Sequence, residues 1–203
     1  MKLKQNMILK EFYLNNIVPQ LKDKFGYKNA LATPKLIKAV VNVGLSASQK
    51  DKQFQQNIVE NLMVITGQKP VLTKSKLSIA GFGIREGLVV GAKVTLRGKR
   101  MYDLVSKIID SVLPRVRDFQ GLEKSSIDSR GNLTLGFKEN TVFSEINPEK
   151  SSTIHGLEIS IVSNAKSRDE GMALFQLLKF PFKTGPESTK KRTGNKKNKK
   201  TPK

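Results

Sequence analysis

Four segments of the chain alternate between apolar and polar side chains with a period of two. Their apolar residues are Ile37, Ala39, Val41 and Val43, then Val90, Ala92, Val94 and Leu96, then Leu133, Leu135 and Phe137, and finally Leu157, Ile159 and Ile161. A period of two places these side chains on one face of a strand and the polar ones on the other. Strands covered on both faces would read as continuous apolar runs. The pattern therefore predicts an antiparallel or mixed β-sheet covered on one face only.

Other segments repeat their apolar residues at helical spacing, and these helices are expected to cover the apolar face of the sheet. They span roughly residues 8–25, 54–65, 101–112 and 167–180. Pro19 should kink the first helix or restart it at its first turn, and Pro114 should stop the third. Ser48 or Asp51 is expected to begin the second helix, and residues 167–170 fit a capping box that begins the last. Strands and helices in this order predict an α+β fold.

The net charge divides between a domain and a tail. Lys and Arg number 37 against 17 Asp and Glu, a net charge of +20. Residues 184–203 hold eight Lys or Arg against one Glu, a balance of +7, which leaves +13 on residues 1–183. We expect one α+β domain over residues 1–183 and a disordered Lys-rich tail over 184–203, because the tail has too few apolar residues to form a core. The tail is either a solvated charge run or an arm that binds nucleic-acid phosphates.

The polar face of the predicted sheet is basic. It carries Lys38, Lys93, Arg97 and Lys138, with Asn42 and Thr95 among them and Glu158 as the opposing charge. Such a surface has the charges and hydrogen-bonding groups that bind RNA phosphates, and the open face is expected to point toward RNA. The alternative is that these are ordinary solvated strand residues.

Several residue types that enzymes need are missing. The chain has no Cys, which excludes disulfides, thiolate zinc sites and cysteine nucleophiles, and its one histidine, His155, is expected at the surface or in a turn. No nucleotide-binding glycine motif with correct spacing occurs. Asp118 and Asp128 lie beside Arg117 and Arg130, where local ion pairing explains them better than acid–base catalysis. We therefore expect no enzyme, cofactor or metal, and no membrane association, because no apolar run approaches about 20 residues.

Several stretches in one order resemble a known family. They are residues 34–44, 66–70, 78–87, 93–98, 113–119, 130–132, 156–162 and 165–182. Together they resemble the large-subunit ribosomal protein five family, the ribosomal proteins that bind 5S ribosomal RNA, over essentially residues 1–183. The resemblance implies a cytoplasmic, structural protein of the large ribosomal subunit that attaches 5S rRNA to the large rRNA in the central protuberance. It also implies contacts with P-site tRNA, with a small-subunit head protein across an intersubunit bridge, and with neighbouring large-subunit proteins.

The resemblance also assigns roles to particular residues. Those expected to bind 5S rRNA and the large rRNA are Lys35, Lys38, Asn42, Gly44, Gln68 and Lys69, which join Lys93, Arg97 and Lys138 of the open face. Gly44 has an alternative role, that of allowing a backbone turn. The loop that would face tRNA spans residues 73–85, with Thr73, Lys74, Ser75, Lys76, Ser78, Phe82 and Arg85 as its contact residues. Phe82 either anchors the loop by packing, which is the preferred interpretation, or stacks on a base.

The chain departs from the family pattern at five positions. Many relatives have basic residues where this chain has Leu77 and Gly83, and they have Arg, Gly and Pro where it has Gln120, Ser129 and Ser144. The loop is therefore less charged than expected, which predicts weaker tRNA affinity. The second hypothesis for function, from another class, is a free RNA chaperone or regulatory RNA-binding module that uses the same basic face.

Overall fold

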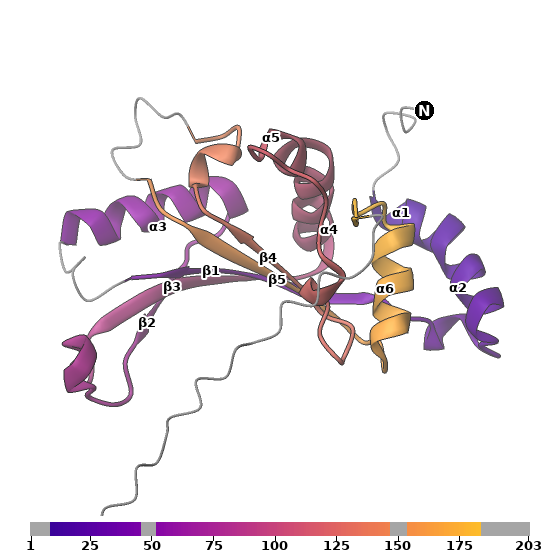
Figure 1. Cartoon of the computed structure of the whole chain (residues 1–203), viewed down its shortest axis with the longest axis horizontal. Helices are drawn as coiled ribbons and strands as arrows, with labels where there is room; N and C mark the ends of the chain where they lie inside the picture. The colour runs from indigo at the N-terminus through magenta and orange to yellow at the C-terminus, as the bar shows by residue number, and fades with distance from the viewer. Residues whose placement is uncertain (1–8, 46–51, 147–153, 184–203) are drawn as a thin grey trace, which may run out of the picture.

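A computed structural model of the chain describes residues 9–45, 52–146 and 154–183 (Figure 1). Its strands are β1 (Leu36–Gly44), β2 (Val71–Lys74), β3 (Val89–Leu96), β4 (Leu133–Phe137) and β5 (Leu157–Ser163). They form one sheet in the order β2-β3-β1-β5-β4, and every neighbouring pair is antiparallel. The predicted sheet is therefore confirmed in its antiparallel form.

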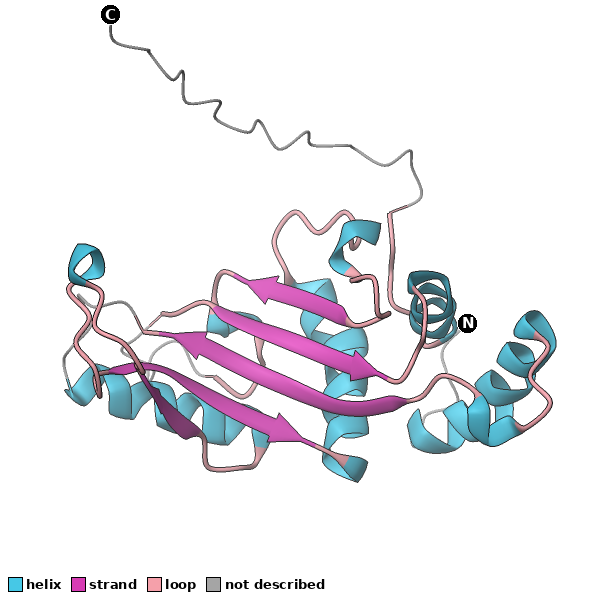
Figure 2. Ribbon diagram, turned by 90° about the horizontal axis from the view of Figure 1, so that it is seen from below, coloured by secondary structure: helices cyan, strands magenta, loops and turns pink. Residues whose placement is uncertain are grey.

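The helices leave one face of this sheet open. They are α1 (Leu9–Phe12), α2 (Val18–Phe25), α3 (Lys52–Thr66), α4 (Gly98–Lys107), α5 (Leu113–Arg115) and α6 (Arg168–Leu177). Helices α3, α4 and α5 lie on one side of the sheet, and α1, α2 and α6 lie at one end of it (Figure 1). No described helix covers the opposite face, which is seen directly in Figure 2. The α+β arrangement with one open face is as the sequence predicted.

The core lies between the sheet and the covering helices. Helix α3 packs on β3 and buries Ile58, Leu62 and Ile65, and α4 packs on β1 and α1. The strands contribute the buried apolar residues Leu36, Ala39, Val41, Val43, Ala92, Val94, Leu96, Leu133, Leu135, Phe137, Leu157, Ile159 and Ile161. Because the inward positions hold the apolar side chains, the alternate, mostly polar positions point away from the core.

The alternation fails at the start of β1. Leu36 is 5% exposed and Ile37 is 39% exposed, although strict alternation predicts Ile37 in the core. The β1–β5 pairing shifts register between Leu36 and Lys38, as a β-bulge does. A bulge adds one residue to one strand and so exchanges the faces of the residues before it. The prediction for Ile37 is therefore wrong, and Leu36 takes its place in the core.

Both helical prolines follow a turn of π-helix. Such turns span Tyr13–Ile17 and Ile108–Val112, and they precede Pro19 in α2 and Pro114 in α5. A proline is tolerated in the first turn of a helical segment, where its missing N–H breaks no helical hydrogen bond. Pro19 restarts its helix, as predicted, but the prediction that Pro114 stops the helix is wrong, because helical structure continues to Arg115.

The starts of the helices are only partly described. The Ser167 hydroxyl accepts a hydrogen bond from the Glu170 N–H at 3.3 Å, and the Glu170 carboxylate accepts one from the Lys166 N–H at 2.8 Å. The first bond confirms Ser167 as the N-cap of α6, and the second departs from the predicted capping box, because Glu170 bonds the residue before the N-cap instead of the N-cap itself. The positions predicted to begin the first two helices, Ile8 and either Ser48 or Asp51, lie outside the described residues.

The turn before β4 is held against α6 by two glycines. Gly131 has a φ of +72°, and a Cβ added to Gly171 would lie 2.4 Å from the Gly131 Cα. Asp128 shapes this turn by accepting hydrogen bonds from the Arg130 N–H at 2.9 Å and the Asn132 N–H at 2.8 Å. Burial raises the Asp128 pKa, but the hydrogen bonds from Asn132 and Arg130, together with the Arg130 charge, outweigh burial and lower the pKa below its ordinary value. Asp128 thus has a structural role, chiefly through backbone hydrogen bonds.

The substitution Gly171→Ala should destabilise the protein, because the new methyl group would push the turn at Gly131 off α6. Overpacking of this kind costs about 1–3 kcal/mol of unfolding free energy. Gly136→Ala is the matched control, since an added Cβ there meets nothing within 4 Å, and its effect should stay within about 0.5 kcal/mol. Denaturant unfolding of both variants measures the difference, and equal stabilities would contradict the close contact.

Candidate nucleic-acid interface

The cations of the open face gather on two adjacent strands. In the β1–β3 register Asn42 lies opposite Lys93, and one further step of that register places Arg97 beside Lys38. Asn42, Lys93 and Arg97 are exposed, and Lys38 is half-buried. On its other side Asn42 pairs with Glu158, the one carboxylate in the sequences of the five strands. The β1 and β3 half of the face is therefore positive, and β5 carries the single opposing charge.

Small residues flatten this face next to the cations. Gly44 pairs with Gly91, and a Cβ added to Gly91 would lie 2.9 Å from both the Val43 carbonyl oxygen and the Thr73 hydroxyl. Gly91 is thus required by close packing. Gly44 is the last residue of β1, still paired with Gly91 and without a positive φ, so the alternative that it allows a turn is wrong. An added Cβ at Gly44 would meet nothing within 4 Å, which leaves its backbone accessible to a large partner.

Three further predicted residues lie at the margins of the face. The Lys35 N–H donates to the Asn164 side chain, and its carbonyl accepts from the Asn164 N–H at 3.1 Å, which fixes an exposed lysine at the start of β1. Gln68 is half-buried, and in the amide orientation that satisfies both of its ends it donates to the Thr95 carbonyl and accepts from Arg100. Lys69 is exposed, two residues before the β2 residue that pairs with Lys93.

Lys138 lies apart from the other cations. It follows β4, at the edge of the sheet opposite to β2, and lines a hollow of about 370 Å³ together with Arg117, Asp118 and Glu139. Arg115 lines an adjoining hollow. The sequence analysis assigned no RNA-binding role to Arg115 or Arg117, and only local ion pairing to Arg117. The sequence signal that could have pointed to them is the presence of both arginines in residues 113–119, one of the stretches that resemble the ribosomal family.

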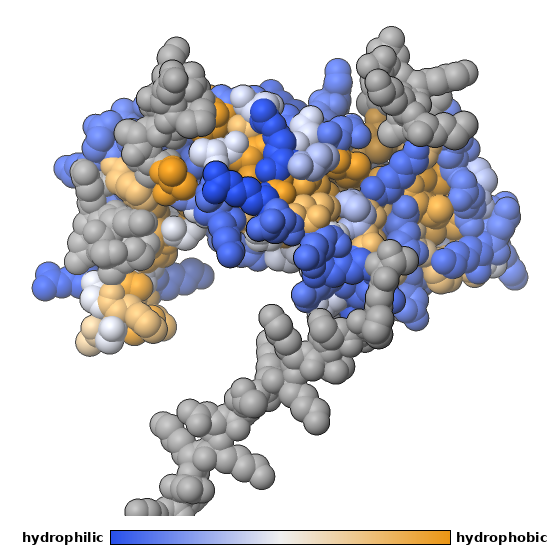
Figure 3. All heavy atoms as spheres, turned by 45° about the horizontal axis from the view of Figure 1, so that its top comes forward, coloured by the Kyte–Doolittle hydropathy of each residue, from blue (hydrophilic) through white to orange (hydrophobic). Residues whose placement is uncertain are grey.

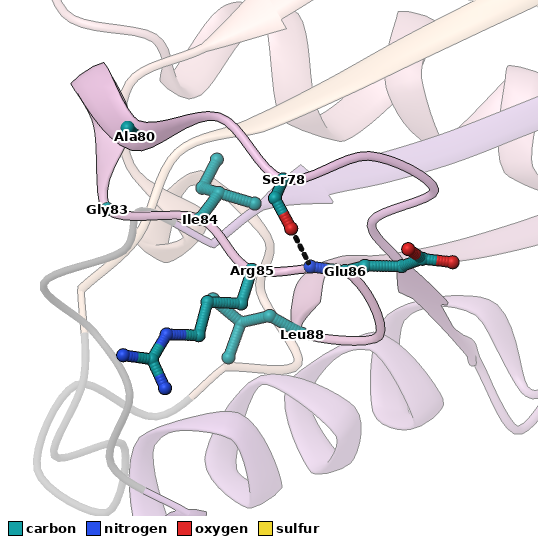
Figure 4. A pocket seen from close by; sticks show the side chains of 7 residues that line it. All are labelled: Ser78, Ala80, Gly83, Ile84, Arg85, Glu86 and Leu88. Carbon is teal, nitrogen blue, oxygen red and sulfur yellow. Dashed lines mark hydrogen bonds between the residues drawn. The ribbon is translucent and has the colours of Figure 1, made fainter.

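The residues predicted to face tRNA lie in the hairpin of β2 and β3, with Thr73 and Lys74 at the end of β2 and the others in the loop between the two strands. The loop projects from the end of the sheet, on the side away from α3 (Figure 1). Backbone hydrogen bonds join Ser75 to Leu88 at 2.8 Å and Ile79 to Ile84 at 2.8 and 3.1 Å. The Ser78 hydroxyl accepts from the Glu86 N–H at 3.0 Å, across a hollow of about 970 Å³ (Figure 4). The loop is therefore an ordered hairpin.

The side chains of this hairpin differ in exposure between its base and the rest of the loop. Lys74, Lys76 and Arg85 are exposed, and Arg85 points away from its neighbour Glu86 (Figure 4). Phe82 is 70% exposed, so the preferred interpretation that it packs to anchor the loop is wrong. Thr73 and Ser75 are half-buried at the base of the hairpin. The loop thus presents cations together with an unpacked aromatic ring.

Gly83, where the resemblance led us to expect a basic residue, has a conformational reason to be glycine. Gly83 has a φ of +62°, in the left-handed region that other residues adopt only with strain. Glycine therefore relaxes the tip of the loop at this position. Leu77, the other departure, is 72% exposed and adds apolar surface instead of charge.

His155 is buried, contrary to the prediction that it lies at the surface or in a turn. It is 7% exposed, with Nε2 3.4 Å from the Asn61 amide nitrogen and Nδ1 3.3 Å from the Gly156 carbonyl oxygen. A neutral ring fits both contacts, because Nδ1–H then donates to Gly156 and Nε2 accepts from Asn61. Burial lowers the His155 pKa, and the hydrogen bond to Gly156 only partly opposes this.

Comparison with known proteins identifies the family. The family model "Ribosomal protein L5" matches residues 29–85, and the model of the C-terminus of the same ribosomal family matches residues 89–182. "Large ribosomal subunit protein uL5" of Carboxydothermus hydrogenoformans is 47% identical over 86% of this chain and 97% of the relative. The proteins of that name from Methylococcus capsulatus and Halothermothrix orenii are 45% and 46% identical, over 87% and 86% of this chain and 98% of each relative. The chain belongs to the ribosomal protein L5 family.

Membership of the L5 family fixes the general role of the chain. It is a structural constituent of the large ribosomal subunit, acts in translation among rRNA and ribosomal proteins, and is not an enzyme. Binding of rRNA is typical of this family. The ribosomal assignment made from the sequence is confirmed, and the hypothesis of a free RNA chaperone loses its basis. Among the described residues, no helix has the length and apolar character needed to cross a membrane.

The free energy of unfolding should decrease as the pH is lowered from about 7.5 to about 5.5. A free histidine has a pKa of about 6.5, so the histidine of the unfolded chain takes up a proton near that pH. Buried His155 resists protonation in the folded protein. The stability that neutral His155 contributes above this pH is therefore lost as the pH falls. No other side chain is a histidine. In His155→Gln, which keeps a hydrogen-bonding side chain, denaturant unfolding should depend much less on pH. An equal dependence of unfolding free energy on pH in both proteins would contradict the assignment of this effect to His155.

Proposed function

We propose that the chain binds 5S rRNA through the open face and attaches it to the large rRNA in the central protuberance. The observation that carries this proposal is the alignment of Lys38, Lys93 and Arg97 on β1 and β3, on a face that no described helix covers. Ammonium and guanidinium groups bind phosphates and release counterions, and Asn42 offers hydrogen bonds to bases or ribose. The family resemblance supports 5S rRNA as the ligand.

The β2–β3 hairpin is proposed to contact P-site tRNA. Its exposed cations lie on an ordered loop that projects away from the sheet, so they can reach an RNA other than the one on the open face. The resemblance alone supports the bridge to a small-subunit head protein and the contacts with neighbouring large-subunit proteins. The tail, residues 184–203, lies outside the described residues. Its disorder, its role as an RNA arm and the domain boundary at residue 183 stay predictions.

Charge reversal on the open face should weaken binding to 5S rRNA without unfolding the protein. Lys93→Glu with Arg97→Glu removes two exposed cations from β3 and its end. Affinity measured by filter binding should fall, and the logarithmic salt slope should decrease by about one for each phosphate that the variant no longer binds. Lys22→Glu with Lys24→Glu, on α2 beyond the end of the sheet, makes the same change in net charge as a control. Equally weakened binding in both pairs would mean that only net charge matters.

Removing the cations of the hairpin should separate the two roles. Lys74→Ala, Lys76→Ala and Arg85→Ala together should leave 5S rRNA binding close to normal, because the three residues lie at the end of β2 and in the loop that follows it, away from Lys38, Lys93 and Arg97. Dissociation of P-site tRNA from ribosomes reconstituted with this variant should become faster. The decrease in binding free energy should reach a few kcal/mol at most, at about 1 kcal/mol for each exposed charged contact. Collapse of 5S rRNA binding with unchanged tRNA dissociation would show that the loop serves the other RNA.

A further inference from the structure

Phe82 is the one aromatic side chain of the described residues that is exposed. The chain has ten Phe and three Tyr and no Trp, all of them within the described ranges, and the other twelve are buried or half-buried. The outward positions of the five strands hold no aromatic residue. Proteins that bind unpaired bases stack them on aromatic rings. The open face therefore lacks a stacking platform, and the tip of the hairpin has one.

The tip of the hairpin is apolar, and its flanks are basic. Leu77, Ile79 and Phe82 are 72%, 45% and 70% exposed, whereas Lys74 ends β2, Lys76 follows two residues later and Arg85 lies on the returning arm. In Figure 3 the projecting end of the molecule at the lower left is orange and white at its extremity, with blue side chains on either side. An exposed apolar cluster on an otherwise charged loop indicates a contact surface.

The tip is also ordered before it binds anything. The Phe82 N–H donates to the Ile79 carbonyl at 3.2 Å, and the Gly83 N–H donates to the Ala80 carbonyl at 3.0 Å. Two further bonds join Ile79 and Ile84 across the hairpin. A loop held in this way loses little conformational entropy on binding, so most of the stacking free energy contributes to affinity.

We propose that the tip of the hairpin binds an exposed nucleobase of a folded RNA, with Phe82 stacking on its face and Leu77 and Ile79 excluding water around it. Lys74, Lys76 and Arg85 bind the phosphates on either side. Glu86 is the single carboxylate between residues 71 and 97, so the hairpin has a net positive charge. This charge favours an RNA as the binding partner, because RNA is anionic. The inference rests on the proposed function only in taking P-site tRNA as the source of the base.

The proposal separates two contributions that respond differently to salt. Phosphate contacts weaken steeply with ionic strength because they release counterions. Stacking of a base on Phe82 and burial of apolar surface involve no net charge. The contribution of Phe82 should therefore stay nearly constant as salt is raised, while that of the three cations declines.

The first test is a series of substitutions at Phe82 in reconstituted ribosomes. Dissociation of P-site tRNA should be about 5-fold to about 150-fold faster with Phe82→Ala, since stacking on an aromatic ring contributes about 1–3 kcal/mol per base. Phe82→Tyr should restore most of the wild-type rate, and Phe82→Leu should restore little. The Phe82→Ala effect should be the same at two KCl concentrations. Full rescue by Leu, or an effect that shrinks with salt, would overturn stacking.

The second test identifies the partner without assuming that it is tRNA. Ribosomes carrying benzoylphenylalanine at position 82 and deacylated tRNA in the P site are irradiated, and the crosslinked component is sequenced. A crosslink to a tRNA base is the expected result. A crosslink to a base of rRNA would keep the nucleobase contact and overturn the tRNA assignment of the loop. A crosslink to a ribosomal protein would overturn the inference itself.

Discussion

Burial of one face of the sheet by α3 and α4 is the interaction on which the rest of the structure depends. Each strand has two faces, so every apolar side chain that packs inward sends its neighbours outward. In β1 and β3 those neighbours are Lys38, Asn42 and Lys93, with Arg97 just beyond. The chain thus builds a core and a basic surface from the same strands. Loss of the inward packing would remove the alignment of the cations as well.

Period-two alternation predicted the sheet and its open face because it depends only on which side chains are buried. It failed at Ile37, where a bulge shifts the register by one residue. The prediction for Pro114 failed for a related reason, since a preceding π-helical turn gives that proline a first-turn position. Bulges and π-turns insert single residues into regular elements. No pattern of hydrophobicity in this chain marks such insertions.

The candidate site was predictable in its strand positions and less so in its loops. Lys38, Lys93 and Arg97 follow from the alternation, but the separation of Lys138 from them depends on strand order, which places β4 and β3 on opposite sides of β1 and β5. The exposure of Phe82 was misjudged, because an isolated aromatic residue in a loop more often packs than projects. The burial of His155 depends on contacts with Asn61, far away in the sequence.

The two candidate RNA surfaces differ in the physics that each can use. The open face has cations, amides and bare glycine backbone but no exposed aromatic ring, so it is suited to recognising the shape and phosphates of folded RNA and offers its bases no aromatic platform. The hairpin has three exposed cations and an apolar tip formed by Leu77, Ile79 and Phe82. Both surfaces carry three cations and one carboxylate, so both attract phosphates at long range. Only the loop adds an exposed aromatic ring and apolar side chains, whose contacts act within a few ångströms, and this short-range contact distinguishes the loop from the open face.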